Sequence, residues 1–243
     1  GIATAKSCAS AAAVRARGCK LIEFKNVTKR YGALTVYQNF SFSLAEGEIT
    51  CILGESGSGK TTLLNMLAGL TPYGGEITPK PLCSYIFQQP RLVPSLTVFG
   101  NLKLVCGDVN AINGMLSAVD LADKANSYPA QLSGGQAQRV AIVRAFLYPS
   151  DAILMDEPFS SLDLGLKLKI AALFLALWKK ERRTAVFVTH DVDEAAMLSN
   201  RVVVLKSGRV AADIRSCGEP SADLFVRAEL KRELISALCG GRS

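Results

Sequence analysis

The stretch GESGSGKT, from Gly54 to Thr61, matches the pattern G-x-x-x-x-G-K-[ST] at every fixed position. In this pattern the glycines let successive backbone N–H groups turn inward and form a concave site for an anion. The helix that follows adds the positive end of its dipole. Lys60 supplies a charge for the outer phosphates of a nucleotide, and Thr61 supplies a hydroxyl for Mg²⁺. The stretch therefore predicts a phosphate-binding loop.

The flanking sequence supports this interpretation, because such a loop needs a strand before it and a helix after it. Ile49–Leu53 is short, apolar and β-branched, as expected of a buried strand. Thr61–Leu70 carries leucines at helical spacing. Both conditions hold, which favours a functional loop over a Gly/Ser-rich turn.

Composition sets broad limits on the protein. A chain of 243 residues with 49% hydrophobic content allows one large domain, or one domain with an inserted lobe, around a sizeable core. The net charge of +7 fits a polyanionic ligand such as a nucleotide or nucleic acid, or an anionic membrane surface. It also fits a basic surface exposed to water, and charge alone does not separate these readings.

The seven cysteines are odd in number and form no C-x-x-C, which argues against a disulfide framework or a zinc site and favours reduced cytosolic thiols. His190 is the one histidine, which removes most metal and histidine-triad sites. The longest apolar run, Ile170–Trp178, is half the ~20 residues of a spanning helix. The N-terminal residues lack the apolar centre of a signal peptide and are expected to form a loose tail.

The first part of the chain predicts an antiparallel layer beside the nucleotide core. Leu21–Phe24 and Ser41–Leu44 both alternate between apolar and polar residues. Tyr31 lies just ahead of this layer, where its ring could stack on a purine base, although spacing alone favours an ordinary half-buried strand tyrosine. Glu76–Pro81 contains two prolines and is expected to be poor strand material.

The middle of the chain, about Arg91 to Ala145, has few strand signals and predicts an inserted helical lobe. QLSGGQ, from Gln131 to Gln136, directly precedes the helical pattern QRVAIVRAFL. A Gly-Gly pair that opens a helix is a potential second anion site. Taken alone, however, S-G-G before a helix is more often a plain N-cap.

Two further apolar strands end in polar residues. Ala152–Met155 runs into Asp156 and Glu157, and Thr184–Thr189 runs into His190. In open α/β folds the carboxyl ends of the strands form the edge where ligands bind. There one carboxylate can hold Mg²⁺ and the next can orient or deprotonate a water, whereas the alternative is an acidic surface turn. The remaining chain predicts a closing hairpin and an amphipathic C-terminal helix.

Together these pieces resemble the nucleotide-binding subunit of ABC transporters, from about Leu21 to Asp213. Six elements occur in the family's order: Tyr31, GESGSGKT, Gln88 after YIF, the signature LSGGQ, ILMDE, and His190 after VFVT. The resemblance implies an α/β fold, a P-loop NTPase with a RecA-like core, an antiparallel β subdomain and an inserted α-helical subdomain. It also implies a tail at 1–19, an ATPase domain at 20–215 with the helical lobe at 91–145, and a short C-terminal helical tail at 216–243.

The resemblance assigns roles to individual residues. Glu157 would polarise the attacking water, His190 would contact the γ-phosphate, and Gln88 would approach Mg²⁺ and sense the transporter. Thr61 and Asp156 would also hold Mg²⁺, and Ser161 to Asp163 would bridge two subunits. The residues expected to contact ATP are Tyr31, Gly54, Glu55, Ser56, Gly57, Ser58, Gly59, Lys60, Thr61, Thr62, Ser133, Gly134, Gly135 and Gln136.

The same resemblance implies partners. The signature residues would act on ATP bound to a second copy of the chain, so the ATPase would work as a homodimer. FQQPRLVPSLTVFGNL, from Phe87 to Leu102, is similar to a stretch of the ATPases of nitrate, sulfonate and taurine importers. This implies transmembrane permease subunits, a solute-binding protein and a place at the cytoplasmic face of the membrane. The chain departs from the family in its lean helical lobe and in the proline-bearing Gly74–Pro81, which replaces the usual strand pair.

Two other functions remain open at this point. An ABC-type ATPase that serves nucleic acid would carry a long coiled coil or two tandem ATPase units, and this sequence has neither. A regulatory ATP-binding module would lack Lys60, Glu157 or His190, and this sequence keeps all three. A transport ATPase without a nucleic-acid partner is therefore the favoured hypothesis, with an exporter as a further alternative to an importer.

Overall fold

The structure, a computed structural model, describes residues 21–160, 162–216, 218–223 and 227–239. The expected N-terminal tail, residues 1–19, lies outside these ranges, as do Ser161 and three of the cysteines. Within the described ranges Cys51, Cys83 and Cys239 are free thiols. These three therefore match the reduced thiols expected from the sequence.

One sheet of six described strands has the order β5-β6-β7-β3-β8-β9. Five strands run parallel, and the last closes the edge antiparallel to its neighbour. The parallel strands are β5 (Cys83–Ile86), β6 (Ala152–Asp156), β7 (Thr184–Thr189), β3 (Ile49–Leu53) and β8 (Arg201–Lys206), and the antiparallel one is β9 (Arg209–Arg215). Parallel strands share one carboxyl edge, so the residues that follow β3, β5, β6 and β7 meet there.

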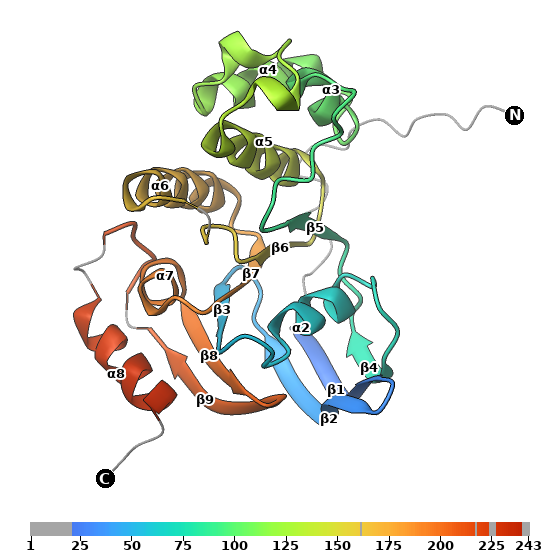
Figure 1. Cartoon of the computed structure of the whole chain (residues 1–243), viewed down its shortest axis with the longest axis vertical. Coiled ribbons are helices and arrows are strands. Elements are labelled where there is room, and N and C mark those ends of the chain that lie inside the picture. Colours follow the sequence, from blue (N-terminus) through green and yellow to red (C-terminus); the bar gives the residue numbers. More distant parts are fainter. Residues whose placement is uncertain (1–20, 161, 217, 224–226, 240–243) are drawn as a thin grey trace, which may run out of the picture.

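A second sheet of three described strands lies beside the first, in the order β2-β1-β4 (Figure 1). β1 (Ile22–Tyr31) pairs antiparallel with β2 (Leu34–Leu44) and with β4 (Gly74–Thr78). The expected antiparallel layer is therefore present. Its first strand is longer than the predicted Leu21–Phe24, because pairing continues to Tyr31 beyond a bulge near Asn26, which has a φ of 51°.

The expectation that Glu76–Pro81 is poor strand material is wrong for its first three residues. They complete β4, which begins at Gly74, and both prolines come after the strand, where no ladder hydrogen bond is needed from them. Gly75 makes this pairing possible. Its φ is +86°, and a Cβ there would lie 2.5 Å from the carbonyl oxygen of Asn26.

The helices cover both faces of the six-stranded sheet and build a lobe above it (Figure 1). They are α2 (Lys60–Leu67), α3 (Val98–Lys103), α4 (Val109–Ala118), α5 (Gly134–Leu147), α6 (Leu164–Glu181), α7 (Val192–Leu198) and α8 (Ala228–Cys239), with short 3-10 turns η1 (Ala122–Lys124) and η2 (Pro129–Gln131). The lobe of α3 and α4 has its own apolar core. α5 belongs to both parts, since Val140 and Val143 pack into the lobe while Ile142 and Phe146 pack toward the sheet. The lobe boundaries at 91 and 145 stay predictions.

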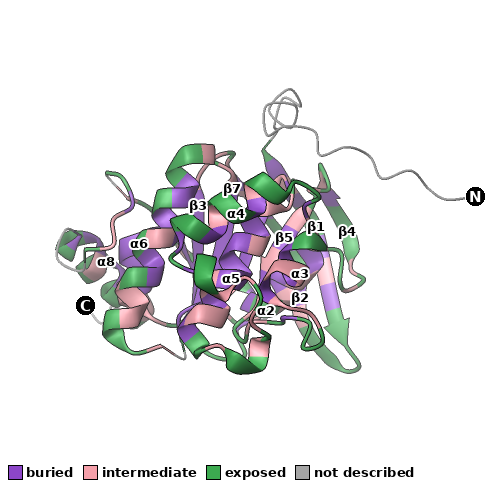
Figure 2. Cartoon of the chain, turned by 90° about the horizontal axis from the view of Figure 1, so that it is seen from above, coloured by how far each residue is buried: buried purple, intermediate pink, exposed green. Residues whose placement is uncertain are grey.

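The sheet separates two apolar cores, because successive side chains of a strand point to opposite faces. In β6, Ile153 and Met155 pack with α5, α6 and α7, whereas Leu154 packs toward α2 and the smaller sheet. Strands that are buried on both faces in this way appear in the sequence as continuous apolar runs. Figure 2 shows the buried residues gathered in the central strands and on the inner faces of the helices.

The C-terminal helix α8 is held against the core at both ends. Just before it, Arg227 donates hydrogen bonds to the carbonyl oxygens of Ala196, Ser199 and Gly218. At its other end, Nζ of Lys206 donates to the carbonyl oxygen of Leu238 over 2.6 Å. A cation at this position stabilises the negative end of a helix dipole. The predicted amphipathic tail helix is thus a packed part of the fold.

Candidate active site

The loop Gly54–Gly59 joins β3 to α2 and is shaped by close backbone contacts. A Cβ on Gly54 would lie 2.5 Å from the carbonyl oxygen of Leu205, so only glycine fits there. Gly59 has a φ of +104°, and its carbonyl oxygen accepts a hydrogen bond of 2.9 Å from the hydroxyl of Tyr37. On the outer side, the N–H of Gly208 donates to the carbonyl oxygen of Ser58 over 3.2 Å. The loop is therefore braced by β2 and by the β8–β9 turn.

Two polar groups of this loop fit a phosphate ligand. Lys60 is only 6% exposed, and its Nζ donates to the carbonyl oxygens of Gly54 (2.7 Å) and Glu55 (2.9 Å). Burial lowers the pKa of this ammonium. The hydroxyl of Ser58 is buried without a hydrogen-bond partner, which is costly unless a ligand satisfies it. A cradle of glycines, a buried cation and an unsatisfied hydroxyl together suit a nucleotide phosphate.

Thr61, in the first turn of α2, faces the end of β6. Its hydroxyl donates to Oδ1 of Asp156 over 2.9 Å, and the hydroxyl of Tyr85 lies 3.4 Å from Oδ2. Burial raises the pKa of Asp156, while the hydrogen bond from Thr61 works in the opposite direction. A hydroxyl and a carboxylate are hard oxygen ligands of the kind that Mg²⁺ prefers. The pair therefore fits a magnesium ion.

Glu157 and His190 meet at the neighbouring strand ends. Nδ1 of His190 lies 3.3 Å from Oε1 of Glu157, and the N–H of Glu157 donates to the carbonyl oxygen of Val188 on β7. Glu157 has a φ of +44°, a left-handed conformation that is unfavourable for a residue with a side chain. Strained residues of this kind cluster at functional sites. The arrangement puts a carboxylate and an imidazole together near the phosphate-binding loop.

Gln88, which follows β5, is tied to the same loop. Its Nε2 donates to Oγ of Ser160 over 3.1 Å, and this hydroxyl donates to the carbonyl oxygen of Glu157. The structure thus brings together Lys60, Thr61, Gln88, Asp156, Glu157 and His190 at the carboxyl edge of the sheet, as the sequence predicted.

Two predicted elements lie apart from this edge. Ser133 caps α5, its hydroxyl accepts from the N–H of Gln136, and Oε1 of Gln136 accepts from the N–H of Ser133. This is a capping box, the plain structural interpretation of S-G-G. Figure 1 shows α5 with α3 and α4, away from α2. The signature residues and the loop of one chain are not brought together.

Tyr31 is the other element that the structure leaves apart from the loop. It lies at the end of β1 with 48% of its surface exposed, and Nζ of Lys29 lies 4.4 Å from the centre of its ring. The aromatic residue that does contact the loop is Tyr37. A role for Tyr31 toward adenine stays a prediction.

The sequence analysis did not predict a network of charged side chains that begins at Asp191, the residue after His190. Nζ of Lys167, on α6, lies 2.6 Å from Oε1 of Glu194 and 2.8 Å from Oδ2 of Asp191. Asp191 caps α7 through the N–H groups of Asp193 and Glu194, and the hydroxyl of Thr189 donates to Glu194. Burial raises the pKa of Glu194 and opposes ionisation of Asp191, whose pKa is nevertheless lowered overall by Lys167. The network joins α6 to the segment that carries His190.

Gln138 was also missed. It lies on α5, is 2% exposed, and its Nε2 donates to the carbonyl oxygen of Pro158 over 2.8 Å. This hydrogen bond connects the helix after LSGGQ to the loop that carries Glu157. A polar residue inside an otherwise apolar helical stripe is the one sequence signal that would have pointed to it.

Comparison with known proteins decides the family. Residues 37–160 match the family model described as ABC transporter. The chain belongs to the ABC transporter family. It is 43% identical over 228 residues to the aliphatic sulfonates import ATP-binding protein SsuB 1 of Paracoccus denitrificans, covering 89% of this chain and 93% of that protein. It is 41% identical over 197 residues to the corresponding SsuB of Granulibacter bethesdensis, covering 79% of this chain and 83% of that protein.

Solved structures agree with this assignment. A dimeric ATP-binding cassette in a post-hydrolysis state, bound to ADP and Pi, superposes with a TM-score of 0.71 at 32% identity and covers 81% of this chain and 99% of that one. The chain is accordingly an ABC-type ATPase with the P-loop NTPase fold expected from the sequence. None of the helices in the described ranges combines the length and apolar character needed to cross a membrane.

Proposed function

We propose that this ABC ATPase powers an importer of sulfonate-like anions through a separate membrane permease. The observation that carries the proposal is the intact catalytic edge, where the His190–Glu157 contact and the Thr61–Asp156 hydrogen bond lie beside a braced phosphate-binding loop. The similarity to proteins named for import of aliphatic sulfonates supports the solute class.

In this proposal each residue at the carboxyl edge of the sheet has its own role in ATP hydrolysis. The loop amides of residues 54–62 and the ammonium of Lys60 bind the phosphates, exchanging their contacts within the loop for phosphate oxygens. The carboxylate of Glu157 orients the attacking water and accepts its proton. The imidazole of His190, 3.3 Å from that carboxylate, holds it in place and contacts the γ-phosphate.

Thr61, Asp156 and Gln88 would hold Mg²⁺. When bound, the ion neutralises charge that develops between the outer phosphates. Thr61 and Asp156 already lie 2.9 Å apart, and Gln88 reaches the same loop through Ser160.

Each complete site requires two copies of the chain. Ser133, Gly134, Gly135 and Gln136 open α5 at the positive end of its dipole, with the N–H groups of Ser133 and Gln136 paired in the capping box, yet they lie apart from the loop of their own chain. In the proposed homodimer they bind ATP held by the opposite subunit, with Tyr31 stacked on adenine. Leu162 and Asp163, together with Ser161 outside the described residues, would line the contact between subunits.

The permease would dock beside Gln88, so that its movements reach Glu157 through Ser160. We place the subunit at the cytoplasmic face of the membrane, with a solute-binding protein delivering the anion from the other side. No role with nucleic acid is proposed.

Uptake by cells tests the solute. Cells lacking this chain should lose uptake of labelled alkanesulfonates and regain it with the wild-type chain, but not with Glu157→Gln. Retained sulfonate uptake with loss of nitrate uptake would overturn the solute class. Loss of efflux rather than uptake would overturn import. Co-purification with nucleic acid in place of a permease, with a steep salt dependence, would overturn transport itself.

A further inference from the structure

Lys29, on β1, is a buried cation that lies outside the set of residues assigned above to ATP hydrolysis. It is 5% exposed, and its Nζ donates to Oγ1 of Thr71 (2.6 Å) and to the carbonyl oxygen of Pro72 (2.7 Å). The same ammonium lies 4.4 Å from the centre of the Tyr31 ring, which is within the range of a cation–π contact. All three contacts are with uncharged groups. Because it is costly to bury a charge without an ionic partner, this arrangement requires an explanation.

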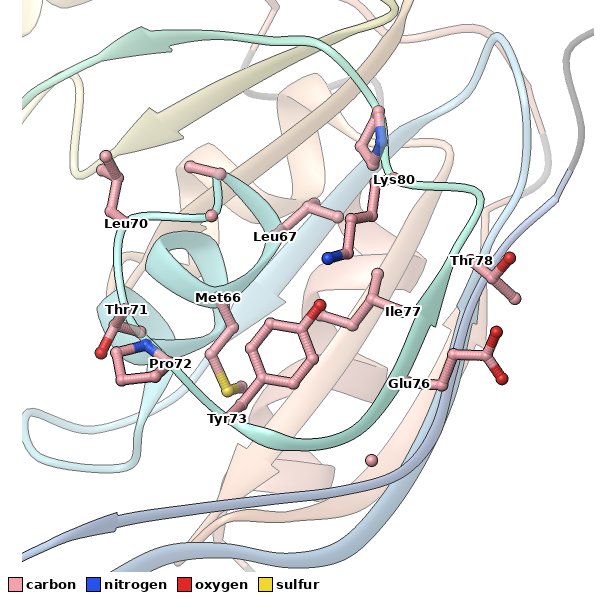
Figure 3. A pocket seen from close by; sticks show the side chains of 14 residues that line it. Met66, Leu67, Leu70, Thr71, Pro72, Tyr73, Glu76, Ile77, Thr78 and Lys80 are labelled. Atoms are coloured by element: carbon pink, nitrogen blue, oxygen red, sulfur yellow. The ribbon is translucent and has the colours of Figure 1, made fainter.

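The two oxygen acceptors connect Lys29 to the helix that follows the phosphate-binding loop. Figure 3 shows Thr71 and Pro72 in the turn that leads from α2 towards β4. α2 begins at the phosphate-binding loop, and this turn follows its other end. The side chain of Lys29 therefore joins the end of β1 to the element that carries the loop.

A second connection runs through β2. Lys29 lies opposite Tyr37 in the antiparallel ladder between β1 and β2. The hydroxyl of Tyr37 donates to the carbonyl oxygen of Gly59 in the phosphate-binding loop over 2.9 Å. Lys29 is thus held relative to the loop along two routes, and its ammonium in turn contacts the ring of Tyr31.

The ring of Tyr31 has a cation on one face, while 48% of the residue is exposed. An exposed ring of this kind can accept a flat base on its other face. The base and the phosphates are at opposite ends of a nucleotide, so the residues that bind them should lie apart. The separation of Tyr31 from the phosphate-binding loop is therefore compatible with one nucleotide that contacts both.

We propose that Lys29 is a positioning residue for Tyr31, and that it holds the ring in one orientation and at one distance from the phosphate-binding loop. This inference rests on the proposed function, in which Tyr31 stacks on adenine. A ring that is fixed before the ligand arrives loses less conformational entropy on binding. This advantage exists only for a ligand that has a base, so Lys29 should contribute to the affinity for the nucleoside and not to the affinity for the phosphates.

Calorimetry with ADP and with pyrophosphate tests the inference on the full-length chain, because the two ligands share a diphosphate and differ in the nucleoside. Lys29→Met keeps the apolar stem and removes the charge, so the affinity for ADP should fall about three- to tenfold. Tyr31→Ala removes the stacking surface, so the affinity for ADP should fall at least about fivefold. Both variants should bind pyrophosphate as the wild type does.

Three further variants separate positioning from other effects. Lys29→Arg should bind ADP to within about twofold of the wild type, because a guanidinium also forms cation–π contacts. The double variant Tyr31→Ala, Lys29→Met should bind ADP no more weakly than Tyr31→Ala, because Lys29 acts through the ring. Lys25→Met, an exposed lysine of the same strand, is the matched control and should bind both ligands as the wild type does.

A competing role for Lys29 is to stabilise the turn at the negative end of the α2 dipole. In that case Lys29→Met would lower the melting temperature with unchanged affinity for ADP, which would refute the inference and leave adenine stacking intact. Equal losses of affinity for ADP and pyrophosphate, or additive losses in the double variant, would also refute it. Unchanged affinity of Tyr31→Ala for ADP would instead refute the stacking role in the proposed function, and the inference with it.

Discussion

At the scale of one residue, Glu157 has an unfavourable backbone conformation and a side chain that belongs to the candidate active site. Its φ of +44° costs of order 1–3 kcal/mol, and a glycine would avoid most of that cost. The position instead carries a carboxylate 3.3 Å from His190. Local stability alone would not select this residue, so its side chain is the reason for its presence.

The first prediction concerns that carboxylate. Glu157→Gln keeps the size of the side chain but removes the proton acceptor, so turnover should fall at least about a hundredfold while ATP still binds. Steady-state hydrolysis and equilibrium ATP binding measure the two effects. Glu46→Gln, an exposed surface change, is the control. Undiminished hydrolysis by the variant would exclude Glu157 as the base.

The second prediction concerns Lys167, which we treat as a positioning residue for His190. Lys167→Met leaves the almost fully buried carboxylate of Glu194 without its cation, so the free energy of unfolding should fall by about 3 kcal/mol. Because Asp191 follows His190 directly, turnover should fall about tenfold with little change in KM for ATP.

Two further variants separate positioning from general destabilisation. Lys167→Arg should retain most of the turnover, since its guanidinium also reaches two carboxylates. The double variant Lys167→Met, Glu194→Gln should recover stability, because the unpaired charge is gone. If turnover recovered fully together with stability, Lys167 would have only a structural role.

At the scale of an element, an ion pair joins the two strands of the β8–β9 hairpin to each other. Arg201 donates from Nε and Nη2 to the two carboxylate oxygens of Asp213, over 2.7 and 2.6 Å, and it also donates to the carbonyl oxygen of Ser43 on β2. The pair therefore joins the edge of the large sheet to the small one. The turn between β8 and β9 also supports the phosphate-binding loop, because the N–H of Gly208 donates a hydrogen bond to a carbonyl oxygen of that loop.

The third prediction follows from that pair. The hydrogen bonds from Arg201 lower the pKa of Asp213 below its ordinary value. The stabilisation is therefore fully present above the unfolded-state pKa of about 3.9 and is lost as the pH falls through the lower folded-state value. Asp213→Asn should lower the free energy of unfolding by about 1–2 kcal/mol at pH 7, an amount reduced by the partial exposure of the carboxylate.

Denaturant titrations of wild type and Asp213→Asn at several pH values test this prediction. The difference in stability should be constant from pH 7 to about pH 5 and should shrink below about pH 4. A difference that persisted unchanged in acid would show that the charge of Asp213 contributes nothing.

At the scale of the whole molecule, the separation of α5 from α2 implies an assembly of two chains. Gly134 offers a precise test, because a Cβ there meets no atom within 4 Å in the same chain. A glutamate at this first helical position is favoured by the dipole, so Gly134→Glu should fold normally. Its carboxylate would nevertheless repel the phosphate of a nucleotide held by a partner.

The fourth prediction is that Gly134→Glu, placed in the Glu157→Gln background, leaves ATP affinity of the monomer unchanged and weakens ATP-dependent dimerisation at least about tenfold. Sedimentation with and without ATP measures the association. Gly114→Glu on α4, also without atoms within 4 Å of a Cβ, is the matched control. Reduced ATP affinity of the monomer would mean that the signature acts within its own chain.

The parts of the fold that are formed by residues close together in the sequence were predicted best. β3, the phosphate-binding loop and α2 follow each other along the chain. β6 and β7 can be recognised in the sequence as apolar runs that end in polar residues. The topology rule for parallel strands then gathered Asp156, Glu157 and His190 correctly. These features needed no knowledge of distant contacts.

The rest depended on partners far apart in the sequence. β4 was missed because the two prolines that follow it outweighed Gly75, whose close contact with Asn26 exists only when β1 lies alongside. Lys167 was not singled out, since its partners lie 24 and 27 residues further along the chain and no local pattern marks them. For LSGGQ, both interpretations from the sequence persist, because one capping box can shape an anion site for another molecule.

The bracing of the phosphate-binding loop has a thermodynamic consequence. Tyr37 and Gly208 each donate a hydrogen bond to a carbonyl oxygen of the loop, so the backbone has already lost its conformational entropy when the protein folds. Nucleotide binding then has little ordering left to oppose it. More of the intrinsic affinity for ATP therefore remains for the proposed association of two subunits, and through it for the proposed coupling to a permease.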